Sequence, residues 1–192
     1  MIAALLILAA VYGAVAVVVS VRNSRVNGAL DADPKLSTRN RMIHHQNSRA
    51  GALYRFGLYH ASYNACEVIA VHNAKLLLGI SSSYSATVRD FQKAGAMVGL
   101  GIFGSNPYLI GRVLRRSGIP FCRLKKGELR GPGVYIVSFW NEGKPWHGLH
   151  TVAAYFNGES FQFYNFGGQV SRKEAFGSVF FENNYICSYF LP

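Results

Sequence analysis

The chain begins with an almost entirely apolar segment. Residues 2–21 contain no charged side chain, and this length is about what a helix needs to cross a bilayer core of roughly 30 Å. A cleaved signal peptide normally has a basic start, a shorter apolar stretch and a small-residue cleavage site. Here nothing basic precedes the apolar run, which continues beyond the small residues at 14–16, and no polar face suggests a core helix. The pattern therefore predicts a retained transmembrane anchor over residues 1–21.

A polar and basic segment follows the anchor, over residues 22–50. Seven basic side chains lie in and just after it: Arg22, Arg25, Lys35, Arg39, Arg41, Arg49 and Arg55. The acidic side chains there are Asp31 and Asp33. Because positive flanks stay on the cytoplasmic side, we expect a single-pass protein of the cell membrane with a cytoplasmic C-terminal domain. We interpret residues 22–50 as a basic juxtamembrane tether that binds anionic membrane lipid.

Three helices are predicted in the first half of the remaining chain. Apolar positions recur at helical spacing from 65 to 78, where a glycine closes the helix. A second helix is predicted over 86–97. A third is predicted to end near residue 117, with Ser105 or Asn106 as its N-cap and a proline in its first turn.

The second half has the pattern of an antiparallel sheet. Residues 133–140 and 149–156 are rich in β-branched and aromatic side chains, as strands are. An Asn-Gly pair at 157–158 then separates the second run from a third over 161–166, which is a strong hairpin signal. A last strand is predicted over 185–190. Helices first and an antiparallel sheet after indicate an α+β fold.

Composition narrows the choice of function. Residues 51–192 are long enough for one domain, and half of the whole chain is hydrophobic. The formal net charge is +11, which suits an anionic membrane surface as well as nucleic acid. No aromatic RNA-binding motif or basic recognition helix accompanies it, so we expect no nucleic-acid partner. The three cysteines form no CxxC pair, which disfavours a zinc or disulfide framework, and we expect reduced thiols, no metal and no cofactor.

One glycine motif is rejected as a nucleotide site. Residues 99–104 match G-x-G-x-x-G. A dinucleotide site requires this motif between a strand and a helix of a βαβ unit, whereas here a helix precedes it. We interpret it as a tight glycine link between two helices, with a loop that lines a groove as the alternative.

Cys66 is the candidate nucleophile because it opens the first predicted helix. A helix N-terminus stabilises a thiolate, and its free N–H groups can hold an oxyanion. A base is still required, and the hairpin supplies His150. With a two-residue turn, His150 faces Asn165 on the next strand, and an Asn beside a His can orient its ring. A four-residue loop shifts this register by two but keeps both residues on one face.

Each of these residues also has an ordinary structural interpretation. Cysteine is among the most buried residue types, His150 alone fits a hydrogen-bonded strand histidine, and Asn165 alone fits a turn. Their order and placement together favour a Cys-His-Asn triad. His147, in the preceding loop, ranks second as the base. His72 is predicted to point away from Cys66, since it lies about 240° further round the same helix.

These residues carry a family resemblance. The segments "CEVIAVHNAKLLLG" and "LHTVAAYFNGESFQFYNF" resemble the bacteriocin-processing, double-glycine leader peptidases of the papain-like superfamily over residues 59–166. The resemblance implies a cysteine-bearing helical half, a histidine-bearing sheet half, and cleavage of leader peptides after Gly-Gly beside a peptide exporter.

The chain differs from that family around the cysteine and at the third triad position. The family has glycine where this chain has Glu67, and Asp where this chain has Asn165. Its oxyanion glutamine corresponds in position to His60, and Asn64, two residues before the cysteine, is a second candidate donor.

The sequence therefore predicts a membrane-anchored cysteine peptidase of peptide or protein substrates. Its predicted site residues are Cys66, His150 and Asn165, supported by Asn64 and His60, with Trp140 and Trp146 along the cleft. Two alternatives remain. One is an inactive peptide-binding or immunity module at the membrane, and the other is a cell-wall peptide amidase with its domain outside.

Overall fold

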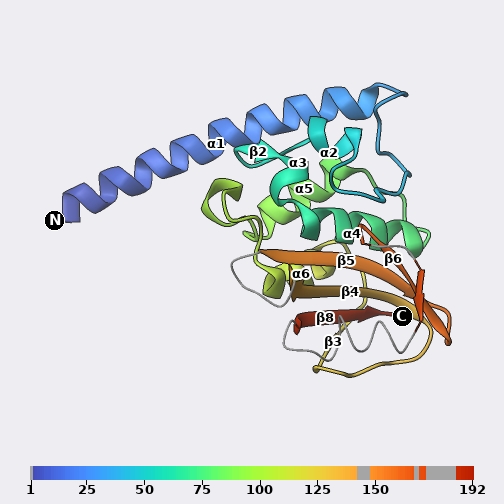
Figure 1. Ribbon diagram of the computed structural model, residues 1–192. Helices are drawn as coiled ribbons and strands as arrows, with labels where there is room; N and C mark the ends of the chain where they lie inside the picture. Colours follow the sequence, from blue (N-terminus) through green and yellow to red (C-terminus); the bar gives the residue numbers. More distant parts are fainter. Residues whose placement is uncertain (1, 142–147, 167–168, 172–184) are drawn as a thin grey trace.

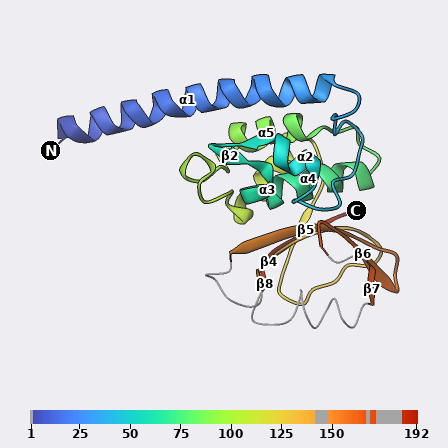
Figure 2. The ribbon, with the colours of Figure 1, turned by 45° about the horizontal axis from the view of Figure 1, so that its top comes forward.

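The chain folds into a helical layer that covers one face of an antiparallel sheet, with a long N-terminal helix lying over the helical layer (Figure 1). This computed structural model describes residues 2–141, 148–166, 169–171 and 185–192. The predicted α+β class is confirmed, with the helices first and the sheet after them. Figure 2 shows the same arrangement from a second direction, with the helices between α1 and the sheet.

Helix α1 spans Ile2–Ala32 and continues well past residue 21, where the apolar segment ends. Its N-terminal half projects from the rest of the chain in both views (Figures 1 and 2). It is the one described helix that is long and apolar enough to cross a membrane. Its second half is docked on the domain, because Asn23 and Asn27 lie one turn apart and are both buried. Residues 22–32, predicted to begin a tether, are therefore helical and packed.

Among the described residues, the helical layer contains five further helices and two short 3-10 turns. They are α2 (Arg49–Leu53), α3 (Ala61–Asn64), α4 (Cys66–Leu77), α5 (Tyr84–Lys93), α6 (Ile110–Arg116), η1 (Gly99–Gly101) and η2 (Pro107–Leu109). A small hairpin, β1 (Arg55–Phe56) with β2 (Tyr59–His60), joins α2 to α3. The helix predicted over 65–78 is confirmed as α4. The one predicted over 86–97 begins earlier because Ser83 caps α5 through the amide of Ala86, and it ends earlier, at Lys93, ahead of Gly95 with a φ of 67°.

The third predicted helix has the expected boundary signals. Asn106, one of the two proposed caps, accepts a hydrogen bond from the Tyr108 amide at 3.0 Å. Pro107 stands in the first turn, and α6 ends at Arg116, just before a glycine with positive φ. The G-x-G-x-x-G segment forms η1 and the turn after it, between α5 and η2. It is a tight link between helices, as predicted.

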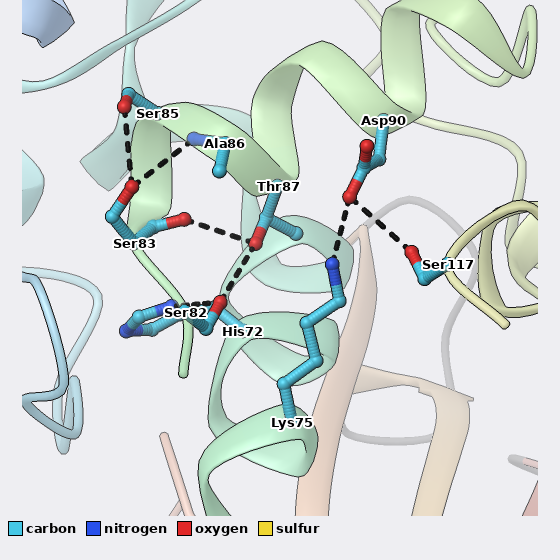
Figure 3. Close-up of polar contacts among 9 residues, drawn as sticks. All are labelled: His72, Lys75, Ser82, Ser83, Ser85, Ala86, Thr87, Asp90 and Ser117. Atoms are coloured by element: carbon cyan, nitrogen blue, oxygen red, sulfur yellow. Dashed lines mark hydrogen bonds and ion pairs between the residues drawn. The ribbon is translucent and has the colours of Figure 1, made fainter. Parts of the chain in front are cut away.

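Buried polar contacts fix α4 against α5, as Figure 3 shows. Lys75 of α4 reaches Asp90 of α5 at 2.7 Å, and Asp90 also accepts a hydrogen bond from Ser117. His72 is fully buried, with its ring nitrogens at Ser82 Oγ (3.0 Å) and the Arg41 carbonyl (2.9 Å). His72 therefore serves the core and not the cysteine, in agreement with its predicted direction.

In the part of the chain that the structure describes, the sheet has six antiparallel strands in the order β3-β8-β4-β5-β6-β7. They are β3 (Cys122–Leu124), β4 (Gly133–Trp140), β5 (Leu149–Phe156), β6 (Ser160–Tyr164), β7 (Gln169–Ser171) and β8 (Tyr185–Leu191). Helix α4 packs on β5 and β4, and their alternate residues form the core with it. The other face carries a second cluster, in which Tyr135, Phe156, Phe161 and Phe163 are fully buried.

The β5–β6 hairpin differs from its predicted register. Ala154 pairs with Phe163 and Phe156 with Phe161, so four residues form the loop in place of two. The side chain of Asn157 explains the longer loop, because its oxygen accepts hydrogen bonds from the amides of Glu159 and Ser160, both at 2.9 Å. The shift by two leaves every side chain on its expected face.

Candidate active site

A cleft of about 570 Å³ opens between the N-terminus of α4, the segment after η1 and the ends of β4 and β5. Its lining residues come from several parts of the chain: Gln46, Tyr63, Asn64, Cys66, Glu67, Ile102, Phe103, Gly104, Ser105, Trp140, Asn141, Gly148, Leu149 and His150. Cys66, His150 and Asn64 thus meet at one cleft, together with Trp140 and the end of the glycine segment. Trp146 and His147 lie outside the described residues.

Cys66 is the first residue of α4 and is almost completely buried, with 6% of its surface exposed. Its sulfur lies 3.4 Å from Glu67 Oε2 and 3.7 Å from the Leu149 carbonyl oxygen. Both oxygens accept, so the sulfur carries its proton. Burial, followed by the charge of Glu67, raises the pKa of the Cys66 thiol well above its ordinary value. The resting cysteine is therefore a neutral thiol, although a helix N-terminus favours the thiolate.

Glu67 is a buried acid beside the candidate nucleophile. Only 2% of its surface is exposed, and it lies in the first turn of α4. Burial raises the pKa of Glu67 to about 7, against the opposing effects of hydrogen bonds from its own backbone amide and from Cys66. Its carboxyl group therefore changes protonation near neutral pH. The sequence marks Glu67 only as a departure from the resembling family, and its coupling to the thiol appears only in the structure.

The orientation of His150 follows from one short hydrogen bond. Its Nε2 lies 2.7 Å from the backbone carbonyl oxygen of Asn165. A carbonyl oxygen can only accept, so Nε2 carries the proton and Nδ1 of the neutral ring is left as a base. Phe139 packs edge-on against the ring. Burial lowers the pKa of His150, while the Asn165 carbonyl opposes this shift, so the ring stays neutral near pH 7.

Cys66 and His150 line the same cleft without touching through a hydrogen bond. Within the described residues, the thiol is bonded to Glu67 and Leu149, and the ring to Asn165. Catalytic hydrogen bonds are often long or absent in an unliganded enzyme and tighten when substrate binds. A working pair would therefore need a rotation of one of these two side chains.

Asn165 contacts His150, but not with the group that the sequence predicts. Its side-chain oxygen accepts a hydrogen bond from the backbone N–H of Gln46 at 2.6 Å, and its own backbone N–H donates to the His44 carbonyl at 3.0 Å. The reason is local. Strand β6 ends at Tyr164, and Asn165 adopts a φ of 68°, which turns its side chain away from the expected position. In this structure the ring is held by the backbone carbonyl oxygen of Asn165, whereas the predicted contact was with its side chain.

The two predicted oxyanion donors lie in different surroundings. The side-chain nitrogen of Asn64 donates a hydrogen bond to the Gly101 carbonyl, and its buried side-chain oxygen has no hydrogen-bond partner among the described residues. An oxyanion needs a donor, so the free atom of Asn64 is of the wrong kind. His60 is exposed on β2 and does not line the cleft. The backbone amides at the start of α4 remain as candidate donors.

Gln46 is a cleft residue that sequence reasoning missed. It lies in the segment interpreted as a tether, far from Cys66 along the chain, and no local pattern marks it. Its side-chain nitrogen donates to the Ser62 carbonyl at 3.0 Å. It also lines a second cavity, of about 450 Å³, with His150 and Asn165. Gln46 therefore links the candidate nucleophile's cleft to the residue that orients the histidine.

Neither a family model nor a curated protein matches this chain. In the described ranges, no three side chains of His, Cys, Asp and Glu cluster in the way that metal ligands do. The functional assignment therefore depends on the residues of the cleft.

Proposed function

We propose that the protein is a membrane-anchored cysteine peptidase with a papain-like site. One observation carries this proposal: a cysteine at a helix N-terminus and a histidine of fixed tautomer, with Nδ1 unprotonated, line the same cleft. These are the nucleophile and the base that acyl transfer requires. The cleft is also large enough to hold several residues of a peptide.

In the proposed reaction, His150 Nδ1 takes the thiol proton while the Cys66 sulfur attacks the peptide carbonyl carbon. The Asn165 carbonyl oxygen accepts a hydrogen bond from Nε2–H throughout the reaction and so stabilises the imidazolium. Backbone N–H groups at the start of α4 hold the oxyanion. The C–N bond then breaks, the amine leaves with the proton from His150, and water hydrolyses the thioester with His150 as the base. Glu67 must be protonated or turned aside, because its charge opposes the thiolate.

The remaining parts of the proposal come from the sequence. The apolar half of α1 would span the membrane, and its basic flank would hold the domain in the cytoplasm on anionic lipid. The resemblance to double-glycine leader peptidases suggests leader peptides as substrates and a peptide exporter as a partner. A protease-accessibility assay on intact cells tests this topology. Digestion of the C-terminus from outside would favour the cell-wall amidase.

A second candidate, a peptide-binding module without turnover, is favoured by the Cys66–Glu67 contact. The carboxylate raises the pKa of the thiol, which is the opposite of what a nucleophile needs. Such a module would use the same cleft and hold its peptide uncleaved.

The deciding experiment incubates the full chain in lipid nanodiscs with a library of peptides and identifies products by mass spectrometry. Cleavage that is lost in Cys66→Ala and His150→Ala, and kept in Cys122→Ala, supports the peptidase. Cys122 is a matched control, since it is a free cysteine outside the cleft. Peptide binding without any product, in the unmodified chain as in Cys66→Ala, would instead establish the binding module.

A further inference from the structure

The apolar half of α1 connects to the domain without any intervening linker. At 1.5 Å per residue, residues 2–21 of α1 would extend over about 30 Å, which is the thickness of a bilayer core. Burial of the helix begins at Val19. Ser20 then donates to Gln92 at 3.4 Å and Asn23 to the Gly57 carbonyl at 2.7 Å. If α1 crosses a membrane, the edge of the hydrocarbon layer therefore lies within about one turn of the first domain contact.

Hydrogen bonds continue from α1 to the lip of the cleft. Gly57, whose carbonyl binds Asn23, is followed by Leu58, whose amide donates to the Leu100 carbonyl at 3.0 Å. The next carbonyl, that of Gly101, accepts from Asn64 of the cleft. The approach is tight, because a Cβ atom on Gly57 would lie 1.9 Å from the Leu100 oxygen. The orientation of the cleft relative to α1 is therefore fixed.

Exposed apolar side chains lie at the mouth of the cleft and on the segments directly beside it. We name them the cleft rim: Tyr59, Tyr63, Val98, Ile102 and Phe103, all of them more than a third exposed. Phe103 is the most exposed of them, at 76%, and its neighbours Ile102 and Tyr63 line the cleft with it. The rings of Tyr59 and Tyr63 contact each other at 4.8 Å between centroids. A cluster of this kind marks a contact surface.

The cleft rim lies at the end of the domain from which α1 projects. Figures 1 and 2 both show β2 and the yellow-green loop around η1 on the side of the N-terminal half of α1. Arg22 and Arg25 of α1 and Lys93 at the end of α5 are exposed and basic. Aromatic rings beside basic side chains are typical of the membrane interface, where the lipid headgroups are anionic.

We propose that the cleft rim rests in the headgroup layer of an anionic membrane, and that the cleft takes peptides anchored in or adsorbed to that membrane. The lipid contact follows from α1 and the rim, and the substrate class rests in addition on the proposed peptidase function. A peptide emerging from the same bilayer surface would meet the cleft directly, without first diffusing into solution.

The lipid contact is tested with the full chain in nanodiscs of phosphatidylcholine and phosphatidylglycerol, using brominated lipids as quenchers of tryptophan fluorescence. Phe103→Trp and, as a second probe, Ile102→Trp place the fluorophore in the rim. Tyr155→Trp is the matched control, an exposed aromatic position near the β5–β6 turn. We expect quenching of the added signal at 103 and 102 to be several-fold stronger than at 155. Equal quenching at all three positions would overturn the proposal.

The substrate class is tested separately, with one peptide offered either free or carrying a lipid tail. We expect Val98→Ser, a rim position that does not line the cleft, to raise KM several-fold for the lipidated peptide and to leave cleavage of the free peptide unchanged. An equal effect on both peptides refutes the membrane-bound substrate class. If neither the parent chain nor any variant cleaves either peptide, the proposed peptidase function is wrong. The lipid contact is still decided by the quenching experiment alone.

Discussion

Cys66 and Glu67 are neighbours in sequence and share one buried environment, in which a negative charge on one opposes a negative charge on the other. The carboxyl group has a pKa of about 7 in the folded chain against an ordinary value of 4.5, because of its burial. Between these two values the unfolded chain loses a proton that the folded chain keeps. Stability therefore falls as pH rises through this window, and the loss is complete above pH 7. The total loss in the free energy of unfolding is about 3 kcal/mol, because each unit of difference between the two pKa values corresponds to about 1.4 kcal/mol.

Replacing Glu67 by glutamine should remove this pH-dependent loss. We expect the free energy of unfolding of Glu67→Gln, relative to the parent chain, to gain about 3 kcal/mol between pH 4 and pH 8. Denaturant titrations of the two chains at several pH values measure this difference. Glu159→Gln, at an exposed position in the hairpin loop, is the control. Parallel stability curves for Glu67→Gln and the parent would contradict the assigned pKa.

The same substitution should activate the thiol. With the carboxylate gone, the pKa of Cys66 falls, and a larger fraction is thiolate at neutral pH. We expect iodoacetamide to label Cys66 about tenfold faster in Glu67→Gln, which corresponds to ~1.4 kcal/mol of lost repulsion. Mass spectrometry of the labelled peptides measures this rate. The labelling rate of Cys122 in the same chain serves as the internal reference. If the ratio of the Cys66 rate to the Cys122 rate is the same in the parent and in Glu67→Gln, Glu67 does not control the reactivity of the thiol.

Asn165 offers a test of which atom holds the histidine. Glycine keeps the carbonyl that binds His150 and also tolerates the φ of 68°. We expect Asn165→Gly to retain peptide cleavage within about tenfold, with the loss of the Gln46 contact costing roughly 1 kcal/mol. The cleavage rate of Asn165→Gly is measured together with that of His150→Ala, whose loss of activity serves as the reference. A loss as large as that of His150→Ala would restore the side-chain amide as the orienting group.

At the scale of elements, the sequence pattern predicted those features that neighbouring residues determine, above all the bounds of the strands. The bounds of β4 and β5 agree with the predicted runs, because alternating apolar residues and flanking turns define a strand by themselves. Of the two hairpin registers considered, the two-residue turn was wrong and the four-residue loop is confirmed, because the Asn157 side chain, and not the Asn-Gly pair alone, builds the loop. Gln46 and the thiol partner Leu149 were out of reach, because each depends on segments far apart in sequence meeting in space.

The pair between α4 and α5 makes an element-scale prediction. Lys75 is nearly buried, with 8% of its side chain exposed, so Asp90→Ala would leave a buried charge without its partner. We expect Asp90→Ala to lower the free energy of unfolding by about 3 kcal/mol. The double variant Lys75→Met/Asp90→Ala should recover most of this loss, because it leaves no unpaired charge. Thermal unfolding of the parent, Asp90→Ala and the double variant measures the difference, and a double variant no more stable than Asp90→Ala would contradict the coupling.

At the scale of the whole molecule, the N-terminal region is part of the domain and not only its attachment. Asn27 of α1 forms two hydrogen bonds with the backbone of Arg55, at 2.8 and 2.9 Å. Ile43 forms two more with the side chain of Asn73, both at 2.9 Å. Composition suggested a domain over 51–192, because polar residues usually mark linkers. In this chain those polar side chains instead satisfy buried backbone groups.

This packing leads to a prediction about where the chain can be shortened. A chain of residues 22–192 keeps Asn23, Asn27 and Ile43, and we expect it to fold as a soluble monomer with a cooperative unfolding transition. A chain of residues 51–192 loses the hydrogen bonds that Asn23, Asn27 and Ile43 form with the rest of the domain, at about 0.5–1.5 kcal/mol for each, and uncovers the core in which Ile43 packs. Because a domain of this size has only about 5–15 kcal/mol in total, we expect the shorter chain to be unfolded or aggregated. Circular dichroism and thermal unfolding of both chains decide this. A cooperative transition in residues 51–192, at the temperature found for 22–192, would mean that α1 and the segment after it contribute attachment alone.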